Sequence, residues 1–117
     1  MHFIYNLFLY FLNLFKVLRL LFLGANLVSP LTINIKGNLK IGKNITIGRN
    51  VSFKGDCYLE DNVTIESYSL ICDSKILKRS LIKSHSIIEA SEVGALTFVG
   101  PYARVRGNSV IGDSCQI

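Results

Sequence analysis

Large aliphatic or phenylalanine side chains return at every sixth position from Ile33 onward. In the first half of this region, the sixth-position series is Ile35, Ile41, Ile47, Phe53, Leu59, Ile65 and Ile71. The positions two residues earlier form a second series of Ile33, Leu39, Ile45, Val51, Cys57, Val63 and Ser69. All of these residues except Ser69 are apolar. Two apolar positions separated by one other residue predict a short strand with one buried face in each repeat.

The same period continues to the last residue in a new phase. The second sixth-position series is Leu81, Ile87, Val93, Val99, Val105, Ile111 and Ile117. From residue 91 onward, the positions two residues earlier hold small side chains, namely Ser91, Thr97, Ala103, Ser109 and Cys115. Because Ile71 and Leu81 are ten positions apart, we expect one extra four-residue excursion between them. The polar segment 72–80 can supply that excursion.

A period of six fits neither an α-helix nor a plain alternating strand, and it is typical of the hexapeptide repeats of a parallel β-helix. Three such repeats make one coil, so residues 33–117 predict an all-β domain of about four to five coils. The alternative is an antiparallel β-sandwich, whose hairpins favour Asn-Gly or Gly-Gly turns at irregular spacing. Here glycine instead follows directly after a predicted inward residue, at Gly42, Gly48, Gly94, Gly100 and Gly112. A fixed place for glycine favours the β-helix, because its corners need backbone conformations that glycine adopts easily.

The segment 3–23 is rich in apolar residues and predicts one hydrophobic α-helix. On a helix, its polar residues would fall on one side together with Asn26, the next polar residue in the chain, which makes the helix amphipathic. These residues are Asn6, Asn13, Lys16, Arg19 and Asn26. A transmembrane span needs about 20 apolar residues, whereas the uncharged run Phe3–Phe15 has 13. A signal peptide carries its positive charges before the apolar run, and here they follow it. A helix at an interface or packed on a partner fits best, and membrane contact through residues 3–23 stays open.

Three segments follow from these patterns. Residues 1–23 form the amphipathic hydrophobic helix, residues 24–32 a linker, and residues 33–117 the β-helix. Gly24 is a favourable end for the helix, and Ser29-Pro30 interrupts the chain before the repeats begin.

Charge and cysteine content narrow the functional classes. The chain of 117 residues has a net charge of +5, and its basic residues are spread out without a concentrated stripe or interleaved aromatic residues. Nucleic-acid binding is therefore not expected. The three cysteines lack metal-ligand spacing and an even count for disulfides, so we expect no metal site, reduced thiols and a cytoplasmic protein. His85 is interpreted as a partly buried corner residue rather than a catalytic base.

The segment from Gly100 to Arg106, Gly-Pro-Tyr-Ala-Arg-Val-Arg, is the most distinctive short motif in the chain. In the repeat pattern Val105 points inward, so Arg104 and Arg106 on either side of it point outward. A guanidinium group offers a planar fork of hydrogen-bond donors that suits a phosphate. The alternative is that both arginines are solvated surface residues.

This motif resembles Gly-Pro-(Phe/Tyr)-Ala-Arg-(Leu/Val)-Arg of the bifunctional N-acetylglucosamine-1-phosphate uridyltransferase/glucosamine-1-phosphate N-acetyltransferase family. The resemblance extends over residues 19–117. Arg19 to Gly24 and Leu27 to Pro30 are similar to that family's linker between two domains, and the repeats that follow are similar to the start of its acetyltransferase domain.

The resemblance implies a left-handed β-helix that forms a homotrimer and uses acetyl-CoA as co-substrate. Glucosamine-1-phosphate is acetylated in this family to make a precursor of UDP-N-acetylglucosamine, which serves peptidoglycan and lipopolysaccharide synthesis. The second arginine of the motif holds the sugar phosphate in the family, and it falls on Arg106. Arg104 and then Tyr102 are weaker substrate-binding candidates.

Two departures from the family pattern bear on activity. Gly107 stands where the family usually has proline, which loosens the corner that aims Arg106. The family's catalytic histidine and acetyl-CoA contacts lie beyond the residues matched here, and the uridyltransferase half has no counterpart. We therefore expect a partial acetyltransferase domain that has no catalytic residue, binds no cofactor alone and is inactive unless a C-terminal acetyltransferase fragment complements it. The alternatives are a structural β-helix scaffold attached to a membrane or partner through its helix, and a different hexapeptide acyltransferase.

Overall fold

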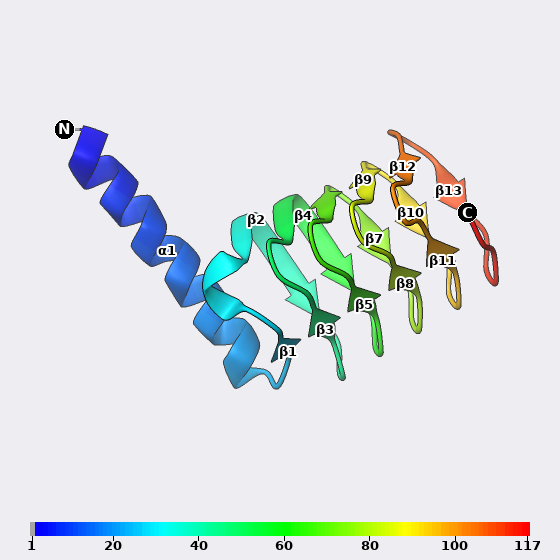
Figure 1. The fold of residues 1–117 in the computed structure, drawn as a ribbon, viewed down its shortest axis with the longest axis horizontal. Coiled ribbons are helices and arrows are strands. Elements are labelled where there is room, and N and C mark those ends of the chain that lie inside the picture. Colours follow the sequence, from blue (N-terminus) through cyan, green and yellow to red (C-terminus); the bar gives the residue numbers. More distant parts are fainter. Residues whose placement is uncertain (1) are drawn as a thin grey trace.

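The computed structural model describes residues 2–117; Met1, the first residue of the predicted segment 1–23, lies outside the described residues. The chain begins with one long helix and continues as a column of short strands (Figure 1). The elements in order are α1 (His2–Phe22), β1 (Asn26–Leu27), the 3-10 helix η1 (Pro30–Thr32), β2 (Asn34–Ile41), β3 (Thr46–Ile47), β4 (Ser52–Leu59), β5 (Thr64–Ile65), β6 (Leu70–Cys72), β7 (Lys75–Ile76), β8 (Leu81–Ile82), β9 (Ile87–Glu89), β10 (Glu92–Val93), β11 (Phe98–Val99), β12 (Arg104–Val105) and β13 (Val110–Ile111).

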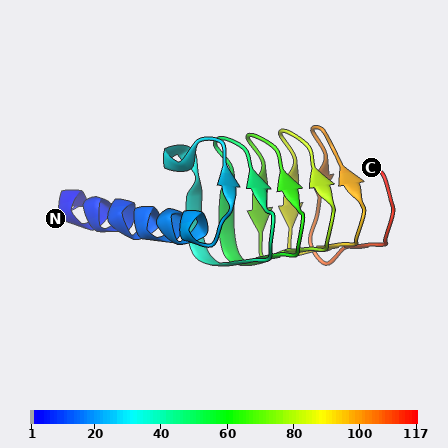
Figure 2. The same cartoon turned by 90° about the horizontal axis from the view of Figure 1, so that it is seen from below.

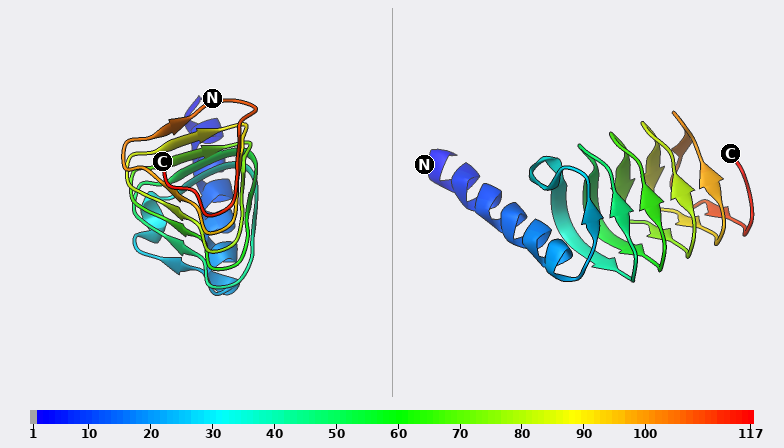
Figure 3. Two further views of the ribbon diagram at one scale, coloured as in Figure 1. Left: turned by 90° about the vertical axis from the view of Figure 1, so that its right-hand side faces the viewer. Right: turned by 60° about the horizontal axis from the view of Figure 1, so that its bottom comes forward.

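The strands form a parallel β-helix, as the hexapeptide period predicted, with the left-handed coiling that the family resemblance implied. Every strand pair is parallel, and each strand before β11 pairs with the equivalent strand one coil later. Strands β1, β3, β5, β8 and β11 make one face. The face of β2, β4, β6, β9 and β12 has one strand from each of five coils, which confirms the predicted coil number. Seen along the axis, the coils nearly superpose on one another (Figure 3).

Side chains on the inner side of the strands stack into a continuous core. Phe53, Leu59 and Ile65 are fully buried, and each lies one face further around the same coil. A tight corner follows each strand, and the residue before the next inward position has a positive φ angle in almost every corner. Asparagine occupies several of these corners, which suits a conformation that few side chains tolerate. The repeat pattern therefore indicates both which residues are buried in the core and where the chain turns at the corners.

The predicted excursion at 72–80 is wrong. The structure places β7 (Lys75–Ile76) inside that segment, with Ile76 fully buried on the face that continues to β10. Ile71 and Ile76 are five residues apart, and so are Ile88 and Val93, because two corners are one residue shorter than the others. Several coils are therefore 17 rather than 18 residues long, as the register of Tyr58 with Lys75 shows.

The assignment of inward residues between these two short corners is also wrong by one position. Leu81 and Ile87 were expected to point inward, but Ile82 and Ile88 are the fully buried residues and their predecessors are only partly buried. Both positions of each pair are aliphatic, so the pattern alone does not tell which residue faces the core. The predicted and observed series meet again at Val93, where the second short corner ends.

Helix α1 covers the first coil and then extends away from it (Figure 2). Val17 and Leu20 are 2% and 1% exposed and pack on the core of the first coil. The Asn13 side chain donates to the carbonyl of Ile33 at 2.9 Å and accepts from the amide of Ile35 at 2.7 Å. These bonds satisfy the unpaired edge of β2, which would otherwise invite association with another strand. The polar side of the predicted amphipathic helix thus faces the β-helix.

Lys16 and Arg19 add two more bonds along the same edge. The Lys16 ammonium donates to the carbonyl of Gly37 at 2.8 Å, and the Arg19 guanidinium donates to the carbonyl of Leu39 at 3.2 Å. The last two turns of α1 are therefore fixed to the first coil by both apolar and polar contacts.

Candidate functional site

The motif from Gly100 to Arg106 lies on the fifth coil, at the end of the column opposite to α1 (Figure 1). Val105 is 7% exposed and completes the core, while Arg104 and Arg106 are exposed. Residues two apart on a strand point to the same side. The two arginines therefore project outward from the same face, as the repeat pattern predicted for them.

Arg104 is engaged by a carboxylate of the preceding coil. Its Nε and Nη2 atoms both donate to Oε1 of Glu89, at 3.1 and 2.8 Å. Arg104 and Glu89 are both partly or fully exposed, so water screens this ion pair and its contribution to stability is small. The pair does orient the Arg104 side chain along the coil. Sequence reasoning missed Glu89, because it lies 15 residues before its partner and outside the motif.

Arg106 presents the free guanidinium of the site. Among residues 3–117 it has no side-chain hydrogen bond or ion pair, whereas its backbone carbonyl accepts from the hydroxyls of Ser91 and Ser109 at 2.8 and 2.7 Å. The backbone is thus held by two bonds while the side chain stays available. An exposed guanidinium on a fixed backbone can bind a phosphate through paired N–H donors.

Tyr102 belongs to a stack of three rings that runs across three coils. The ring of His85 lies between the rings of Tyr68 and Tyr102, with centroids 5.1 and 4.8 Å apart and planes within 18° of parallel. Tyr102 is 75% exposed, so the stack forms an outer edge of the column. The three residues are spaced by 17, and this spacing is the signal that would have found the stack once the coil length was known.

His85 is a corner residue, as expected, but it is exposed rather than partly buried. Ser86 occupies the inward slot instead, and its hydroxyl accepts from the amide of Ala103 at 3.4 Å. The imidazole of His85 has no hydrogen-bond partner among the residues that the structure describes. A general base is normally oriented by such a partner, so the geometry gives His85 no catalytic arrangement.

The cysteines are free thiols in the described part of the chain, and no group of histidine, cysteine and carboxylate residues there could hold a metal ion. Burial raises the pKa of the Cys57 thiol. Burial and then the neighbouring carboxylate of Asp73 raise the pKa of the Cys72 thiol. Higher pKa values keep both thiols protonated at neutral pH, which makes them poor nucleophiles.

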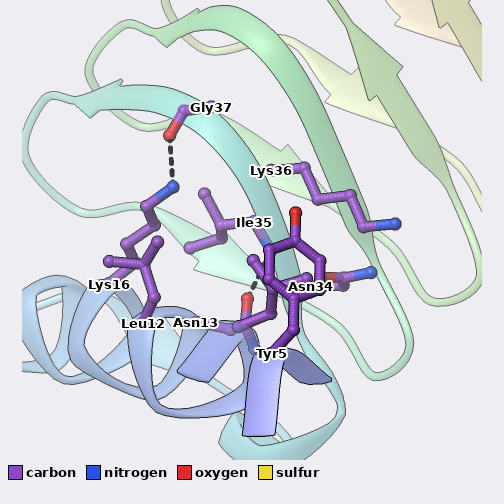
Figure 4. Close-up of a pocket in the computed structure, with 9 residues that line it drawn as sticks. Tyr5, Leu12, Asn13, Lys16, Asn34, Ile35, Lys36 and Gly37 are labelled. Carbon is purple, nitrogen blue, oxygen red and sulfur yellow. Dashed lines mark hydrogen bonds between the residues drawn. The ribbon is translucent and has the colours of Figure 1, made fainter. Parts of the chain in front are cut away.

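A cavity of about 410 Å³ lies at the other end of the molecule, between α1 and β2 (Figure 4). Its walls are formed by Tyr5, Leu9, Leu12, Asn13, Lys16, Asn34, Ile35, Lys36 and Gly37. The arginine site is therefore separate from this cavity and lies on an open corner.

Comparisons with known proteins agree with the fold and the motif. A family model described as the GMPPB C-terminal domain matches residues 23–117. The bifunctional protein GlmU of Nitrosospira multiformis is 35% identical over 99 residues, which are 85% of this chain and 22% of that protein. GlmU of Marinobacter nauticus is 36% identical over 99 residues, again 85% of this chain and 22% of the relative. These matches confirm the resemblance to the bifunctional family, and the chain spans about a fifth of the length of these relatives.

A solved structure supports the architecture independently. A Bacillus cereus protein described as a candidate acetyltransferase superposes with a TM-score of 0.55 and 23% identity, covering 76% of this chain and 66% of that one. At this identity the likeness concerns the fold alone. The family match, in contrast, takes in the whole β-helix and the arginine motif. Because that match covers most of its length, the chain belongs to the GMPPB C-terminal domain family.

Proposed function

We propose that this chain supplies the first coils of a GlmU-like acetyltransferase domain and holds the phosphate of glucosamine-1-phosphate at Arg106. The observation that carries the proposal is the free, exposed guanidinium of Arg106 within the motif Gly100 to Arg106. The GlmU relatives support the enzymatic domain over a purely structural scaffold, because 80–85% of this chain matches them. The reaction of the complete domain would be acetyl transfer from acetyl-CoA to the amine of the sugar phosphate.

The three candidate residues take different roles in this proposal. Arg106 binds the phosphate, since its donors are unpaired in the described residues. Arg104 adds positive charge beside it, but its fork is already directed at Glu89, so its contribution is smaller. Tyr102 forms the outer wall of the site through its stack on His85.

Acetylation of the amine also needs a base near the operating pH within hydrogen-bond reach of the substrate. Neither the stacked His85 nor the protonated thiols of Cys57 and Cys72 suit that role. We therefore expect these residues to bind the sugar phosphate without transferring the acetyl group. In this proposal, the base and the acetyl-CoA site come from a complementing C-terminal acetyltransferase piece, because further copies in a homotrimer would carry only the same residues.

Calorimetric titration of the full chain with glucosamine-1-phosphate tests the phosphate site. We expect saturable binding that Arg106→Ala weakens by at least about tenfold, because charge-assisted hydrogen bonds are among the stronger polar contacts. Arg106→Lys should retain part of the affinity, since it keeps the charge but loses the planar fork. Arg104→Ala should have a smaller effect than Arg106→Ala.

Arg49→Ala is the matched control, because Arg49 is an exposed arginine on an early coil. Equal losses for Arg49→Ala and Arg106→Ala would show general charge attraction rather than a site. Absence of saturable binding, or binding that Arg106→Ala leaves unchanged, would remove the proposal. Sedimentation equilibrium tests the proposed homotrimer separately, with an expected mass three times the 13.1 kDa of one chain.

A further inference from the structure

Helix α1 carries a large apolar surface that the β-helix does not cover. Phe3, Phe8 and Phe15 are 76%, 61% and 71% exposed, and the apolar residues of the first three turns are exposed around the helix. Figure 2 shows these turns extending beyond the first coil. A soluble protein rarely exposes so large an apolar surface without a partner for it.

The contacts of α1 with the first coil limit how much of the helix could enter a membrane. The helix is long and apolar enough to cross a membrane by length and composition, from Phe3 to Phe22. However, Asn13, Lys16 and Arg19 donate to carbonyls of the first coil, and Val17 and Leu20 are buried against it. Residues 3–12 make no side-chain hydrogen bond to the β-helix, although Tyr5, Leu9 and Leu12 line the cavity beside β2. Ten helical residues span about 15 Å. That length matches one leaflet of a bilayer whose apolar core is about 30 Å thick.

Charge is distributed unequally along the chain. Residues 1–55 contain seven lysines and arginines and no aspartate or glutamate, a net charge of +7. Residues 56–117 contain six basic and eight acidic residues, a net charge of −2. The first coil and α1 are therefore the positive end of the column. Lys16 lies on α1 itself, and Lys36 and Lys40 lie on β2, the strand that α1 contacts.

The positive charge decides between two occupants of the apolar surface. A second copy of the chain packed on α1 would bring two ends of like charge together, which is unfavourable. A bilayer with anionic headgroups offers both an apolar phase for the phenylalanines and opposite charge for the lysines. Apolar insertion combined with basic residues is the usual basis of stable surface attachment.

We propose that residues 3–12 of α1 insert into one leaflet of an anionic membrane while the basic residues of the first coil contact its headgroups. The β-helix then stands on the membrane by its α1 end, and the arginine site at the opposite end stays in solution. This attachment is independent of the sugar-phosphate site, since the two lie at opposite ends of the column (Figure 1).

Cosedimentation of the full chain with vesicles tests the attachment. We expect binding to vesicles of phosphatidylcholine and phosphatidylglycerol in equal parts, and at least about tenfold weaker binding to phosphatidylcholine alone. The double variant Phe8→Asp/Phe11→Asp changes two exposed residues of the inserted segment. It should lose at least about tenfold in affinity, because it places two charges in the apolar phase. The matched control Leu96→Asp/Phe98→Asp changes two exposed apolar residues of a late coil and should bind like the parent chain.

A second pair of variants tests the charge. Lys36→Glu/Lys40→Glu should weaken binding to the anionic vesicles by at least about tenfold, whereas Lys75→Glu/Lys78→Glu on the later coils should change it by less than about threefold. Circular dichroism of each variant confirms that the fold is intact. Equal effects of the two lysine pairs, or binding that the α1 variant does not alter, would overturn the proposal.

Depth of insertion separates one leaflet from a full crossing. The chain has no tryptophan, so Phe3→Trp provides a single reporter near the helix start. We expect its fluorescence to be quenched by lipids brominated deep in the acyl chain and not by iodide trapped inside the vesicles. Quenching by the internal iodide would show that α1 crosses the bilayer and would overturn the one-leaflet arrangement. If the chain instead binds no vesicles and forms oligomers without lipid that Phe8→Asp/Phe11→Asp dissociates, the surface would be assigned to a second copy.

Discussion

The first two coils and the later coils fill the same cross-section with different side chains. Up to Ile65, both inward positions of nearly every repeat are apolar. From Ser69 onward, the first inward position holds a small residue, and most of these residues carry a hydroxyl: Ser69, Ser74, Ser80, Ser86, Ser91, Thr97 and Ser109. The same β-helix therefore has apolar residues at the corners of its early coils and hydroxyl-bearing residues at the corners of its later coils.

The late corners are stable because the hydroxyls from Ser69 to Thr97 each bond to the following coil. The Ser80 hydroxyl donates to the carbonyl of Gly94 at 2.6 Å and accepts from the amide of Thr97 at 3.0 Å. Thr97 repeats this pattern, donating to the carbonyl of Gly112 at 2.9 Å and accepting from the amide of Cys115 at 3.3 Å. Buried hydroxyls are costly only without partners, and no buried side-chain nitrogen or oxygen in the described residues lacks one. The difference between the two regions shows that a large apolar side chain at a corner can be replaced by a small hydroxyl-bearing one, because the hydroxyl forms hydrogen bonds between coils.

The largest loss of stability is expected from removing a large buried side chain from an early coil. Phe53 is 1% exposed and is the largest fully buried side chain, so Phe53→Ala should lower the free energy of unfolding by about 3–5 kcal/mol. Val105→Ala, at the same place on a late coil, should cost clearly less, because it removes two carbon atoms whereas Phe53→Ala removes a whole phenyl ring. Urea denaturation followed by circular dichroism measures both. Equal losses would mean that the two regions depend on apolar packing to the same degree.

A smaller loss of stability is expected when a corner residue of an early coil is replaced by the serine found at that corner in a later coil. Val63 is fully buried at the position that Ser80 occupies one coil later, so Val63→Ser removes buried methyl groups. The loss should be about 2 kcal/mol, near the value of burying a valine side chain, because a new hydroxyl recovers part of it by bonding to the next coil. The denaturation midpoint measures the change. A stability equal to that of the parent chain would show that the apolar corners are interchangeable with the polar ones.

The same two regions explain how much of the fold could be predicted from sequence. In the early coils each inward aliphatic residue has polar neighbours, as Ile47 and Phe53 do, and the period of six identifies every buried position there. In the later coils the pairs Leu81-Ile82 and Ile87-Ile88 are aliphatic at both positions, so hydropathy does not set the phase. The serine series, read from Ser69 in steps of five and six, is the pattern that would have located the short corners.

The candidate site was predictable only in part. The outward direction of Arg104 and Arg106 follows from the inward position of Val105, which the local repeat fixes. The contacts across coils do not follow, because Glu89 and His85 reach the motif only when the coil length of 17 is known. Pairing between coils depends on the exact number of residues in every corner, and a single shortened corner changes all later partners.

The early and late coils also differ at the bend where the chain turns from one face to the next, which lies within β2 and β4 in the early coils. Gly37 and Gly55 occupy it early, with φ angles of 118° and 71°, whereas Ala90 occupies it late with a φ of 45°. A Cβ atom on Gly37 would collide with the carbonyl of Gly55. Gly37→Ala should therefore cost about 1–3 kcal/mol from backbone strain, measured by the thermal midpoint. Gly107→Ala is the control, because its Cβ would have only the Cβ of Ala90 within 4 Å, at 3.9 Å.

The smallest effect is expected at Cys57, whose small side chain occupies a corner of the early region. Cys57 is buried at the place that Ser74 takes one coil later, and its thiol already donates to the carbonyls of Lys54 and Ile71 at 3.3 and 3.5 Å. Burial raises the pKa of this thiol, so it stays protonated and keeps donating at neutral pH. A serine hydroxyl can make the same bond to Ile71 that Ser80 makes to Gly94. Cys57→Ser should change the free energy of unfolding by less than about 1 kcal/mol, well below the loss for Val63→Ser. A loss as large as that of Val63→Ser in the same denaturation series would show that the coil at Cys57 still requires an apolar corner, and that the polar region begins only after it.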